Sequence, residues 1–422
     1  MRPITEAARR TFAALSVRNY RLFFTGQVIS VSGTWMQTVA QAFLVLTVLH
    51  GNGLQMGLVI SLQFVPMLVA GSFGGLIADR ADKRRLLMVT QSAAALLALA
   101  LGLLTATGSV RLWQVYLLAF GLGVVNLFDN PARQSFVSEM VGRELLPNAV
   151  TLNSVTMNSA RIIGPAIGGV LILTLGLADC FFVNAVSYVA VIGALILMRR
   201  AELRPSQRVA RAKGQIREGL RYVRRTPELF DPLVVMAIVG IFAFNFTTTL
   251  PLLAYTTFHG GAGTYSAFTA AMGAGAIAGG LLVAHRSRPS APLLAGIGVA
   301  FAVTIAVVAV APTETVAIVA LVPMGACSLS FISTANATLQ LRADPEMRGR
   351  VMALYAIAFL GSTPIGAPLM GALSDASSPR VALAVGALAT LAASVYLVRR
   401  LRLRRPLVLS APAGAVAPGR AA

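Results

Sequence analysis

The sequence predicts an all-α integral membrane protein, with twelve transmembrane helices in two pseudo-symmetric halves of six. Of its 422 residues, 56% are hydrophobic and only 12% are charged, whereas a soluble domain carries about 25% charged residues. Apolar segments near the length of about 20 residues that crosses a bilayer recur along the whole chain. Basic residues gather in every second gap between these segments. A soluble enzyme and a disordered chain are therefore excluded.

Twelve apolar segments are expected to span the membrane. They lie near 20–49, 54–78, 86–108, 112–132, 147–175, 177–198, 231–257, 264–284, 290–311, 315–338, 350–374 and 380–398. The expected organisation is a tail at 1–18, a first half at 19–199, a linker at 200–230, a second half at 231–399 and a tail at 400–422. The last tail is rich in Ala, Pro and Gly, which predicts disorder. Within the linker, alternating apolar and basic side chains at 215–229 predict an amphipathic helix on the inner membrane surface.

The charge balance predicts the orientation of the chain. It has 35 Lys and Arg against 15 Asp and Glu, a formal net charge of +20. Outside the spans, all basic residues except Arg111 and Arg380 fall in the tails or in gaps that follow even-numbered spans. Because basic loops stay on the cytoplasmic side, both termini of this multi-pass protein are expected in the cytoplasm. A nucleic-acid partner is excluded, because the basic residues are dispersed over alternate loops rather than gathered in one patch.

Three sequence matches relate the two halves. Segments 75–80, 130–134 and 164–168 of the first half match 280–286, 336–340 and 366–371 of the second. The offsets between matched positions all lie between 202 and 206 residues. Repeated halves with a substrate site between them are typical of secondary transporters. No phosphate-binding G-x-x-x-x-G-K-[ST] and no cluster of His, Cys, Asp and Glu is present, which argues against an ATP-driven pump and against an enzyme.

Two motifs resemble those of the major facilitator superfamily. The segment GGLIADRADKRR at 74–85 is similar to the motif G-x-L-x-D-R-x-G-R-[RK] between helices 2 and 3, with Asp82 at the position of its second Gly. The segment GPAIGG at 164–169 is similar to the helix 5 motif of exporters, G-x-x-x-G-P-x-x-G-G, with Ala160 at its first position. Longer segments, among them FDNPARQSFVSEM and NSARIIGPAIGG, resemble the transmembrane secretion effector branch, which includes the bacterial enterobactin exporters.

The resemblance implies a secondary active exporter in the bacterial inner (plasma) membrane. Its substrate would be a small organic molecule, siderophore-like or another hydrophobic metabolite, moved by alternating access with protons as the coupling ion. A multidrug efflux antiporter is the alternative, and an importer of a small organic solute comes third. A monomer without a cofactor is expected. No metal is expected either, since the 3 His and 2 Cys lack the spacing of metal ligands.

Five residues at the end of the second span and just after it are expected to form a conformational gate: Gly75, Asp79, Arg80, Lys83 and Arg84. A carboxylate at Asp79 can face the positive N-terminal end of a neighbouring helix, or pair with Arg80 or Lys83. Either contact would hold one conformation and break in the other. The alternative is a solvated loop that serves only the topology.

Two charged residues lie well inside expected spans, Asp129 in the fourth and Arg161 in the fifth. Charged groups at such depth are costly and rarely face lipid. One interpretation is a structural ion pair between them, because an Arg side chain can bridge their difference in depth. A second is that Arg161 contacts an anionic or catechol-like substrate, and a third is that Asp129 carries the coupling proton.

The first span carries a polar stripe. Its members, at spacings of 3, 4, 3 and 4 on one helical face, are Gln27, Ser30, Thr34, Gln37 and Gln41. Amides in hydrocarbon need partners or water, so the stripe either lines a wet cavity or bonds to neighbouring helices. The other candidate cavity residues are Asn126, Asn158, Asn245 and Thr248.

The fifth span combines small residues with a proline: Gly164, Pro165, Gly168 and Gly169. Glycines let another helix approach closely, and Pro165 removes a backbone hydrogen bond and favours a bend. These residues predict a bendable helix at the interface between the halves. Ordinary packing of small residues is the alternative.

Overall fold

The computed structural model describes residues 12–204, 215–286 and 289–404, and every regular element in these ranges is a helix. Eleven helical segments are long and apolar enough to cross a membrane, so the predicted all-α membrane class is confirmed. The α-helices are α2 Arg18–Phe43, α3 Gly53–Arg80, α4 Lys83–Ala106, α5 Leu112–Thr174, α6 Leu177–Leu197, α7 Gln215–Arg225, α8 Pro227–Phe242, α9 Phe246–Leu252, α10 Ala262–Arg286, α11 Ala291–Ala309, α12 Glu314–Arg342, α13 Arg348–Leu360, α14 Thr363–Ala376 and α15 Pro379–Arg404.

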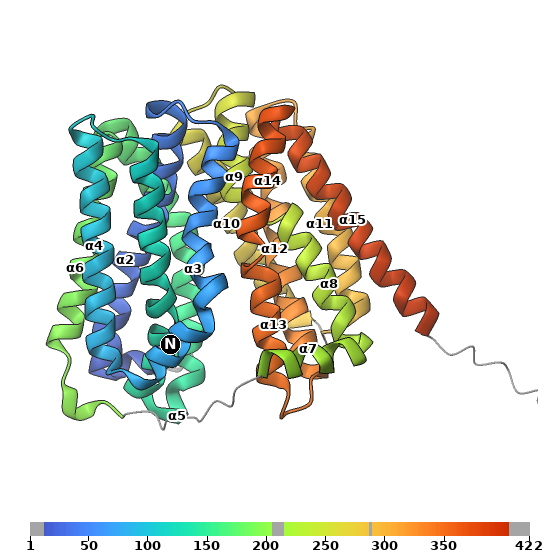
Figure 1. The fold of residues 1–422 in the computed structure, drawn as a ribbon, viewed down its shortest axis with the longest axis horizontal. Helices are drawn as coiled ribbons and strands as arrows, with labels where there is room; N and C mark the ends of the chain where they lie inside the picture. Colours follow the sequence, from blue (N-terminus) through green and yellow to red (C-terminus); the bar gives the residue numbers. More distant parts are fainter. Residues whose placement is uncertain (1–11, 205–214, 287–288, 405–422) are drawn as a thin grey trace, which may run out of the picture.

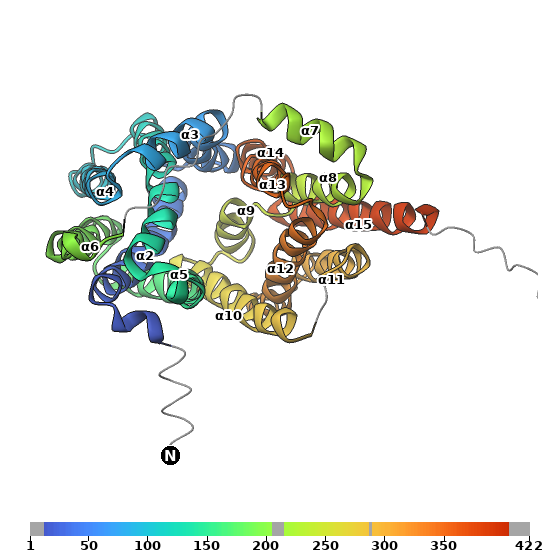
Figure 2. The same cartoon turned by 90° about the horizontal axis from the view of Figure 1, so that it is seen from below.

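The helices pack in two groups (Figures 1 and 2). Helices α2 to α6 pack against one another, and helices α8 to α15 do the same. The groups meet mainly where α3 lies against α14 and where the last part of α5 lies against α10. Helix α9 lies near the middle of the view along the bundle (Figure 2). The helical packing therefore leaves two long seams between the groups.

Helix α5 contains two helices joined at Gly142. This glycine has φ 72° and ψ 179°, and it interrupts an otherwise continuous run of 63 residues. Only glycine reaches that conformation without steric cost. The expected span at 112–132 therefore ends too early, and the expected span at 147–175 begins too late. Residues 133–141, including Arg133 and Glu139, are helical rather than part of a loop.

Two further spans are interrupted near their middle. Helix α8 ends at Phe242, and α9 begins after Asn245, whose side-chain amide donates to the carbonyl of Ile241 (2.6 Å). Helices α13 and α14 are separated at Gly361 and Ser362, just before Pro364. A buried polar side chain and a proline can each explain such a break, because both replace or remove backbone hydrogen bonds. The expected single spans at 231–257 and 350–374 are each built from two helices.

Helix α7 occupies the predicted amphipathic stretch. It also contacts other helices of this chain. Its Tyr222 hydroxyl donates to Asp344 Oδ2 (2.9 Å), and Arg350 Nη1 lies 2.7 Å from Glu218 Oε1. Val223 is buried, whereas Arg221 and its basic neighbours are exposed. These contacts attach the described part of the linker to the end of α12 and the start of α13.

The chain ends differ slightly from the expectation. Helix α2 is preceded by a short 3-10 turn, Ala13–Ser16, and α15 continues to Arg404, five residues beyond the expected end of the last half. The remaining parts of the two expected tails, and part of the linker at 205–214, lie outside the described residues.

Candidate functional site

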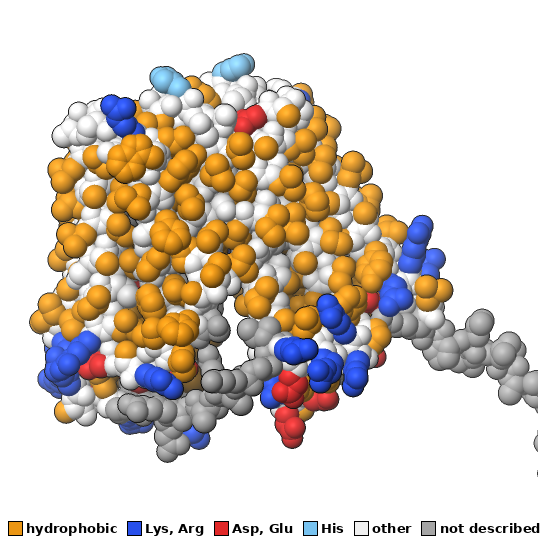
Figure 3. Space-filling view, viewed as in Figure 1, with side chains coloured by type: hydrophobic (Ala, Val, Ile, Leu, Met, Phe, Trp, Pro, Cys, Tyr) orange, Lys and Arg blue, Asp and Glu red, His pale blue; other side chains and the backbone are white. Residues whose placement is uncertain are grey.

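The two ends of the bundle differ in charge and in closure. We call the end that carries Arg80, Lys83 and Arg350 the basic end. The end that carries Asn52, Asp375 and Arg380 is called the opposite end. The space-filling view shows a notch between the two groups of helices at the basic end (Figure 3). The opposite end has no such notch in this view.

The opposite end is closed by direct contact between α3 and α14. A Cβ added at Gly57 would collide with the backbone at Ala367, and one added at Gly371 would collide with the backbone of Gly53. The Ser61 hydroxyl donates to the carbonyl of Pro364 (2.8 Å). The two backbones can approach closely here because glycine has no side chain, and small residues commonly serve this purpose in membrane helices.

Asp375, at the end of α14, adds a polar contact to this closure. Its Oδ1 accepts from the N–H of Gly53 (2.7 Å) and its Oδ2 from the N–H of Leu54 (2.8 Å). These are the first N–H groups of α3, which have no partner inside the helix. A carboxylate at that position is also favoured by the helix dipole.

The sequence prediction missed Asp375. A signal was available, because Gly371-x-Leu373-x-Asp375 has the same pattern as Gly75-x-Ile77-x-Asp79 of the expected gate. The two aspartates end α14 and α3 respectively. The pattern alone does not reveal the partner helix, which the fold supplies.

The second seam runs between α5 and α10. A Cβ added at Gly169 of α5 would lie 2.6 Å from Ser266 Oγ of α10. A Cβ added at Gly273 of α10 would lie 2.6 Å from the side chain of Ile162 of α5. From Ile162 onward, α5 is thus packed against α10. Just before this point, Ser154 and Arg161 are exposed and Asn158 is half-buried. Arg161 therefore lies where the closed part of the seam begins.

Arg161 does not pair with Asp129. Its guanidinium carbon lies 5.1 Å from the ring centroid of Trp35 on α2, and no Asp or Glu forms a salt bridge with it among the described residues. The expected structural ion pair between these residues is therefore wrong for this conformation. A cation over an indole face is electrostatically favourable, but it leaves the positive charge unbalanced.

Asp129 has another basic partner, Arg133, one turn further along α5. Arg133 Nη2 lies 3.2 Å from Asp129 Oδ2. Asp129 Oδ1 accepts from Thr90 Oγ1 and Gln91 Nε2 on α4, both at 2.8 Å. The sequence prediction missed Arg133 because it placed this residue in a loop. Its i, i+4 spacing from Asp129 on a helix would have identified the pair.

The polar stripe of α2 faces neighbouring helices of its own group. Gln27 Oε1 accepts from Arg133 Nη1 (3.1 Å) on α5, and Gln37 Oε1 accepts from Asn184 Nδ2 (2.6 Å) on α6. Thr34 Oγ1 lies 3.4 Å from the hydroxyl of Tyr188 on α6. Ser30 is buried. In this conformation the stripe therefore makes interhelical contacts, and contact with substrate stays a prediction.

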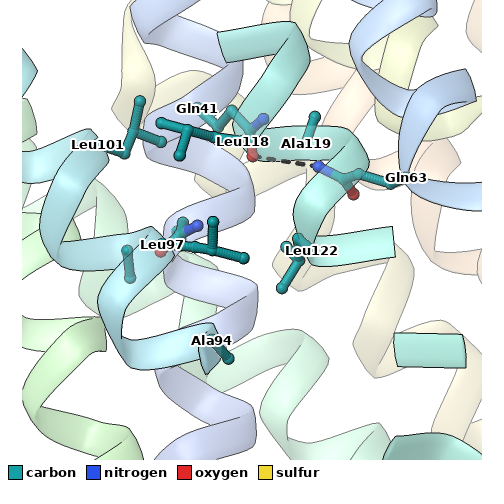
Figure 4. Close-up of a pocket in the computed structure, with 10 residues that line it drawn as sticks. Gln41, Gln63, Ala94, Leu97, Leu101, Leu118, Ala119 and Leu122 are labelled. Atoms are coloured by element: carbon teal, nitrogen blue, oxygen red, sulfur yellow. Dashed lines mark hydrogen bonds between the residues drawn. The ribbon is translucent and has the colours of Figure 1, made fainter. Parts of the chain in front are cut away.

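Gln41, at the end of the stripe, lines a small pocket between α2, α3, α4 and α5 (Figure 4). Its Oε1 accepts from Gln63 Nε2 on α3 (3.3 Å). The surrounding wall is apolar, with Leu97, Leu101, Leu118 and Leu122. This pocket lies inside one group of helices, away from the seams between the groups.

The other candidate cavity residues lie in different surroundings. Asn126 is half-buried in α5, and Asn158 donates to the carbonyl of Ser154 within its own helix (2.9 Å). Asn245 and Thr248 are buried at the break between α8 and α9. Asn245 Oδ1 and Thr248 Oγ1 have no hydrogen-bond partner among the described residues. That these four residues line a cavity together with the stripe stays a prediction.

The expected gate residues divide between buried and exposed positions. Gly75 is buried in α3, Asp79 is half-buried and Arg80 is exposed. Lys83 forms a buried ion pair with Glu139 of α5 (2.7 Å). Arg84 Nε donates to the carbonyl of Leu195 at the end of α6 (2.5 Å).

Asp82 caps the start of α4. Its carboxylate accepts from the N–H of Arg85 (3.1 Å), and its φ is −64°. The turn between α3 and α4 therefore does not need the glycine that the motif has at this position.

The sequence prediction also missed Glu139, because it placed this residue in a loop, as it did Arg133. The apolar spacing of Phe136, Val137 and Met140 is nevertheless helical.

The glycines expected to form a hinge serve close packing here. An added Cβ at Gly164 would meet Trp35 and Ser32 of α2, and one at Gly168 would lie 3.2 Å from the carbonyl of Met36. The backbone around Pro165 is helical, since Gly142 is the residue of α5 with non-helical angles. Bending at Pro165 stays a prediction.

Comparison with known proteins identifies the family. The family described as transmembrane secretion effector matches residues 9–411. The multidrug efflux pump Tap of Mycolicibacterium fortuitum is 26% identical over 82% of this chain and 87% of its own length. The enterobactin exporter EntS of Shigella flexneri is 24% identical, over 85% and 86%. The crystal structure of the nucleoside transporter NupG covers 92% of this chain and 99% of its own, with a TM-score of 0.73 at 10% identity.

The buried pair Lys83–Glu139 is expected to be strongly coupled. Removing one partner leaves an uncompensated buried charge, so Lys83→Met or Glu139→Met should each lower the free energy of unfolding by about 3–5 kcal/mol. The double variant should lose much less than the sum of the two. The exposed pair Arg342–Glu228 (3.0 Å) is the matched control, with an expected coupling below about 1 kcal/mol. Unfolding in detergent measures both cycles, and equal coupling in the two pairs would contradict the prediction.

Proposed function

Because the chain belongs to the transmembrane secretion effector family of the major facilitator superfamily, we propose that it exports a small organic molecule by alternating access. It is a multi-pass inner-membrane transporter and not an enzyme. The observation that carries the proposal is the asymmetry of the two ends, since the seam α3–α14 is closed at the opposite end while a notch opens at the basic end. A siderophore-like or other hydrophobic metabolite is the proposed substrate.

The proposed topology has twelve spans in two six-helix halves with both termini in the cytoplasm. Its support is the division of α5 at Gly142, which turns eleven candidate segments into twelve. The basic end then faces the cytoplasm, in agreement with the distribution of Lys and Arg. The notch would accept substrate from the cytoplasm in this conformation, and opening of the α3–α14 seam would release it outside.

Proton coupling is proposed to use Asp129. Its carboxylate is buried, and it connects α4 and α5 through Thr90, Gln91 and Arg133. Protonation would weaken the pair with Arg133 and free Gln27 of α2, which Arg133 also contacts. A change of charge at one residue would thereby alter contacts among three helices. Coupling through a buried carboxylate is a common arrangement in transporters.

Multidrug efflux is the second candidate, supported by the similarity to the pump Tap. The two candidates differ in the breadth of substrate that the protein accepts. Import of a small organic solute comes last, because the pattern Gly164-Pro165-x-x-Gly168-Gly169 resembles that of exporters.

Accumulation in a strain that lacks the protein tests the proposed function. Loss of a dedicated exporter should raise the intracellular level of iron-chelating metabolites while dye retention stays unchanged. Altered dye retention with unchanged metabolite levels would favour multidrug efflux instead. Reduced uptake of a solute, with neither of these changes, would contradict export.

Asp129→Asn should lower the rate of proton-driven transport into everted vesicles about tenfold or more, because the amide keeps most hydrogen bonds but cannot take up or release the coupling proton. Substrate exchange without a proton gradient should persist. Asp231→Asn is the matched control, since Asp231 is also buried and accepts from the Tyr396 hydroxyl (3.0 Å) in the other group of helices. A wild-type rate and pH dependence in Asp129→Asn would remove Asp129 from coupling.

A further inference from the structure

Arg161 is a charged group at an unusual position. It lies well beyond the break at Gly142, roughly 29 Å further along the helix by its rise per residue. More than a third of its surface is exposed, although it lies near the middle of a membrane-spanning helix. A guanidinium at this depth rarely faces lipid and is expected to meet a partner or water. The carbonyl carbon of Arg161 would lie 3.7 Å from a Cβ added at Gly273 of α10, so Arg161 lies beside the seam between α5 and α10.

The neighbouring acidic groups do not balance this charge. Asp129 is 2% exposed and engaged by Arg133, Thr90 and Gln91. Glu139 is engaged by Lys83 near the basic end. Among the described residues, no carboxylate lies within salt-bridge distance of Arg161. The positive charge of Arg161 is therefore available to a diffusible anion that reaches the seam between α5 and α10.

The surroundings of Arg161 suit an organic anion rather than an inorganic one. The ring of Trp35 lies beneath the guanidinium, and Val28, two helical turns before Trp35 on the same face of α2, is 36% exposed. Ser154 and Asn158 lie on the same face of α5 as Arg161, at helical spacings of 3 and 4. A planar guanidinium binds a carboxylate through two parallel hydrogen bonds. The aromatic and aliphatic surfaces would then contact the apolar body of the same molecule.

We propose that Arg161 and Trp35 form the recognition site for an organic anion, which binds through a carboxylate or a similar planar oxyanion and rests its apolar body on Trp35. The inference rests on the proposed transport function and specifies the class of substrate. It selects anions over neutral and cationic molecules of similar shape. Entry from the basic end is favoured further by the positive potential of that end.

The chain offers its own reporter for this site. It has 2 tryptophans, Trp35 beneath Arg161 and Trp113 at the start of α5. Trp113→Phe therefore leaves Trp35 as the single fluorescent indole. The probes are 2,3-dihydroxybenzoate and the uncharged 2,3-dihydroxybenzamide, which have the same ring and differ in charge. Binding is measured as quenching of Trp35 in the purified full-length protein.

The anion should bind at least about tenfold more tightly than the amide, a difference of about 1.4 kcal/mol. Arg161→Gln should remove this preference while binding of the amide persists, which shows that the variant is folded. Arg161→Lys should retain part of the preference, because it keeps the charge but not the planar fork. Arg380→Gln is the matched control, since Arg380 also lies over an aromatic ring, Phe258 (5.6 Å), at the opposite end.

The site would be overturned by no quenching by the anion up to about 1 mM, the limit of weak binding, by equal affinity of the wild type for both probes, or by an unchanged preference in Arg161→Gln. Equal loss of both probes in Arg161→Gln would assign the residue a structural role and would also refute it. The proposed export fails separately: preserved anion binding without efflux refutes export, whereas wild-type efflux of anions by Arg161→Gln refutes the site.

Discussion

The contact between α3 and α14 is the constraint on which the rest of the structure depends. Two helices approach backbone to backbone at Gly53, Gly57 and Gly371, and the carboxylate of Asp375 accepts the first N–H groups of α3. The contact holds without large side chains, so separating the helices breaks few interdigitated groups. The polar cap is also reversible, because water can satisfy the same N–H groups once the helices separate. Such a seam is suited to closing in one conformation and opening in another.

The second contact between the two groups of helices, between α5 and α10, lies next to several exposed residues of α5. Helix α5 packs against α10 at Ile162 and Gly169, and in the turns just before this contact Ser154 and Arg161 are exposed and Asn158 is half-buried. In the same group of helices, two other charged residues of buried or half-buried position have carboxylate partners, Arg133 with Asp129 and Lys83 with Glu139. The hydrocarbon core favours such internal pairing, since unpaired charges are costly there. Arg161 differs from these residues, and its difference points to a ligand.

Much of the fold was predictable from composition and periodicity. The apolar segments, the amphipathic helix α7 and the small residues in α5 all follow from local patterns of side chains. Residues 133–141 were not predicted to be helical, because Arg133 and Glu139 suggested a loop although each has a buried or nearly buried partner. Periodicity placed the polar stripe on one face of α2, but it cannot say which helix that face meets. The partners Asn184 and Gln63 lie far away in sequence.

The roles of single residues were harder to predict for a related reason. The motif at 74–85 indicated a gate near Asp79, yet the closed seam in this conformation is held by Asp375, in the other half of the chain. The similarity of their patterns becomes meaningful only when α14 is seen against α3. Likewise, their similar depth in the membrane suggested that Asp129 and Arg161 pair. In the structure Asp129 contacts Arg133 and Arg161 contacts Trp35.

Distances across the two ends test the central claim most directly. With Cys180 and Cys327 replaced, spin labels at His50 and Ser377 would report on the opposite end, and labels at Ala81 and Gly349 on the basic end. The account predicts a short distance at the first pair and a long one at the second. Asp375→Asn should weaken the cap, lengthen the first distance and shorten the second. Distances that stay unchanged at both ends, or that increase together, would contradict alternating access through the α3–α14 seam.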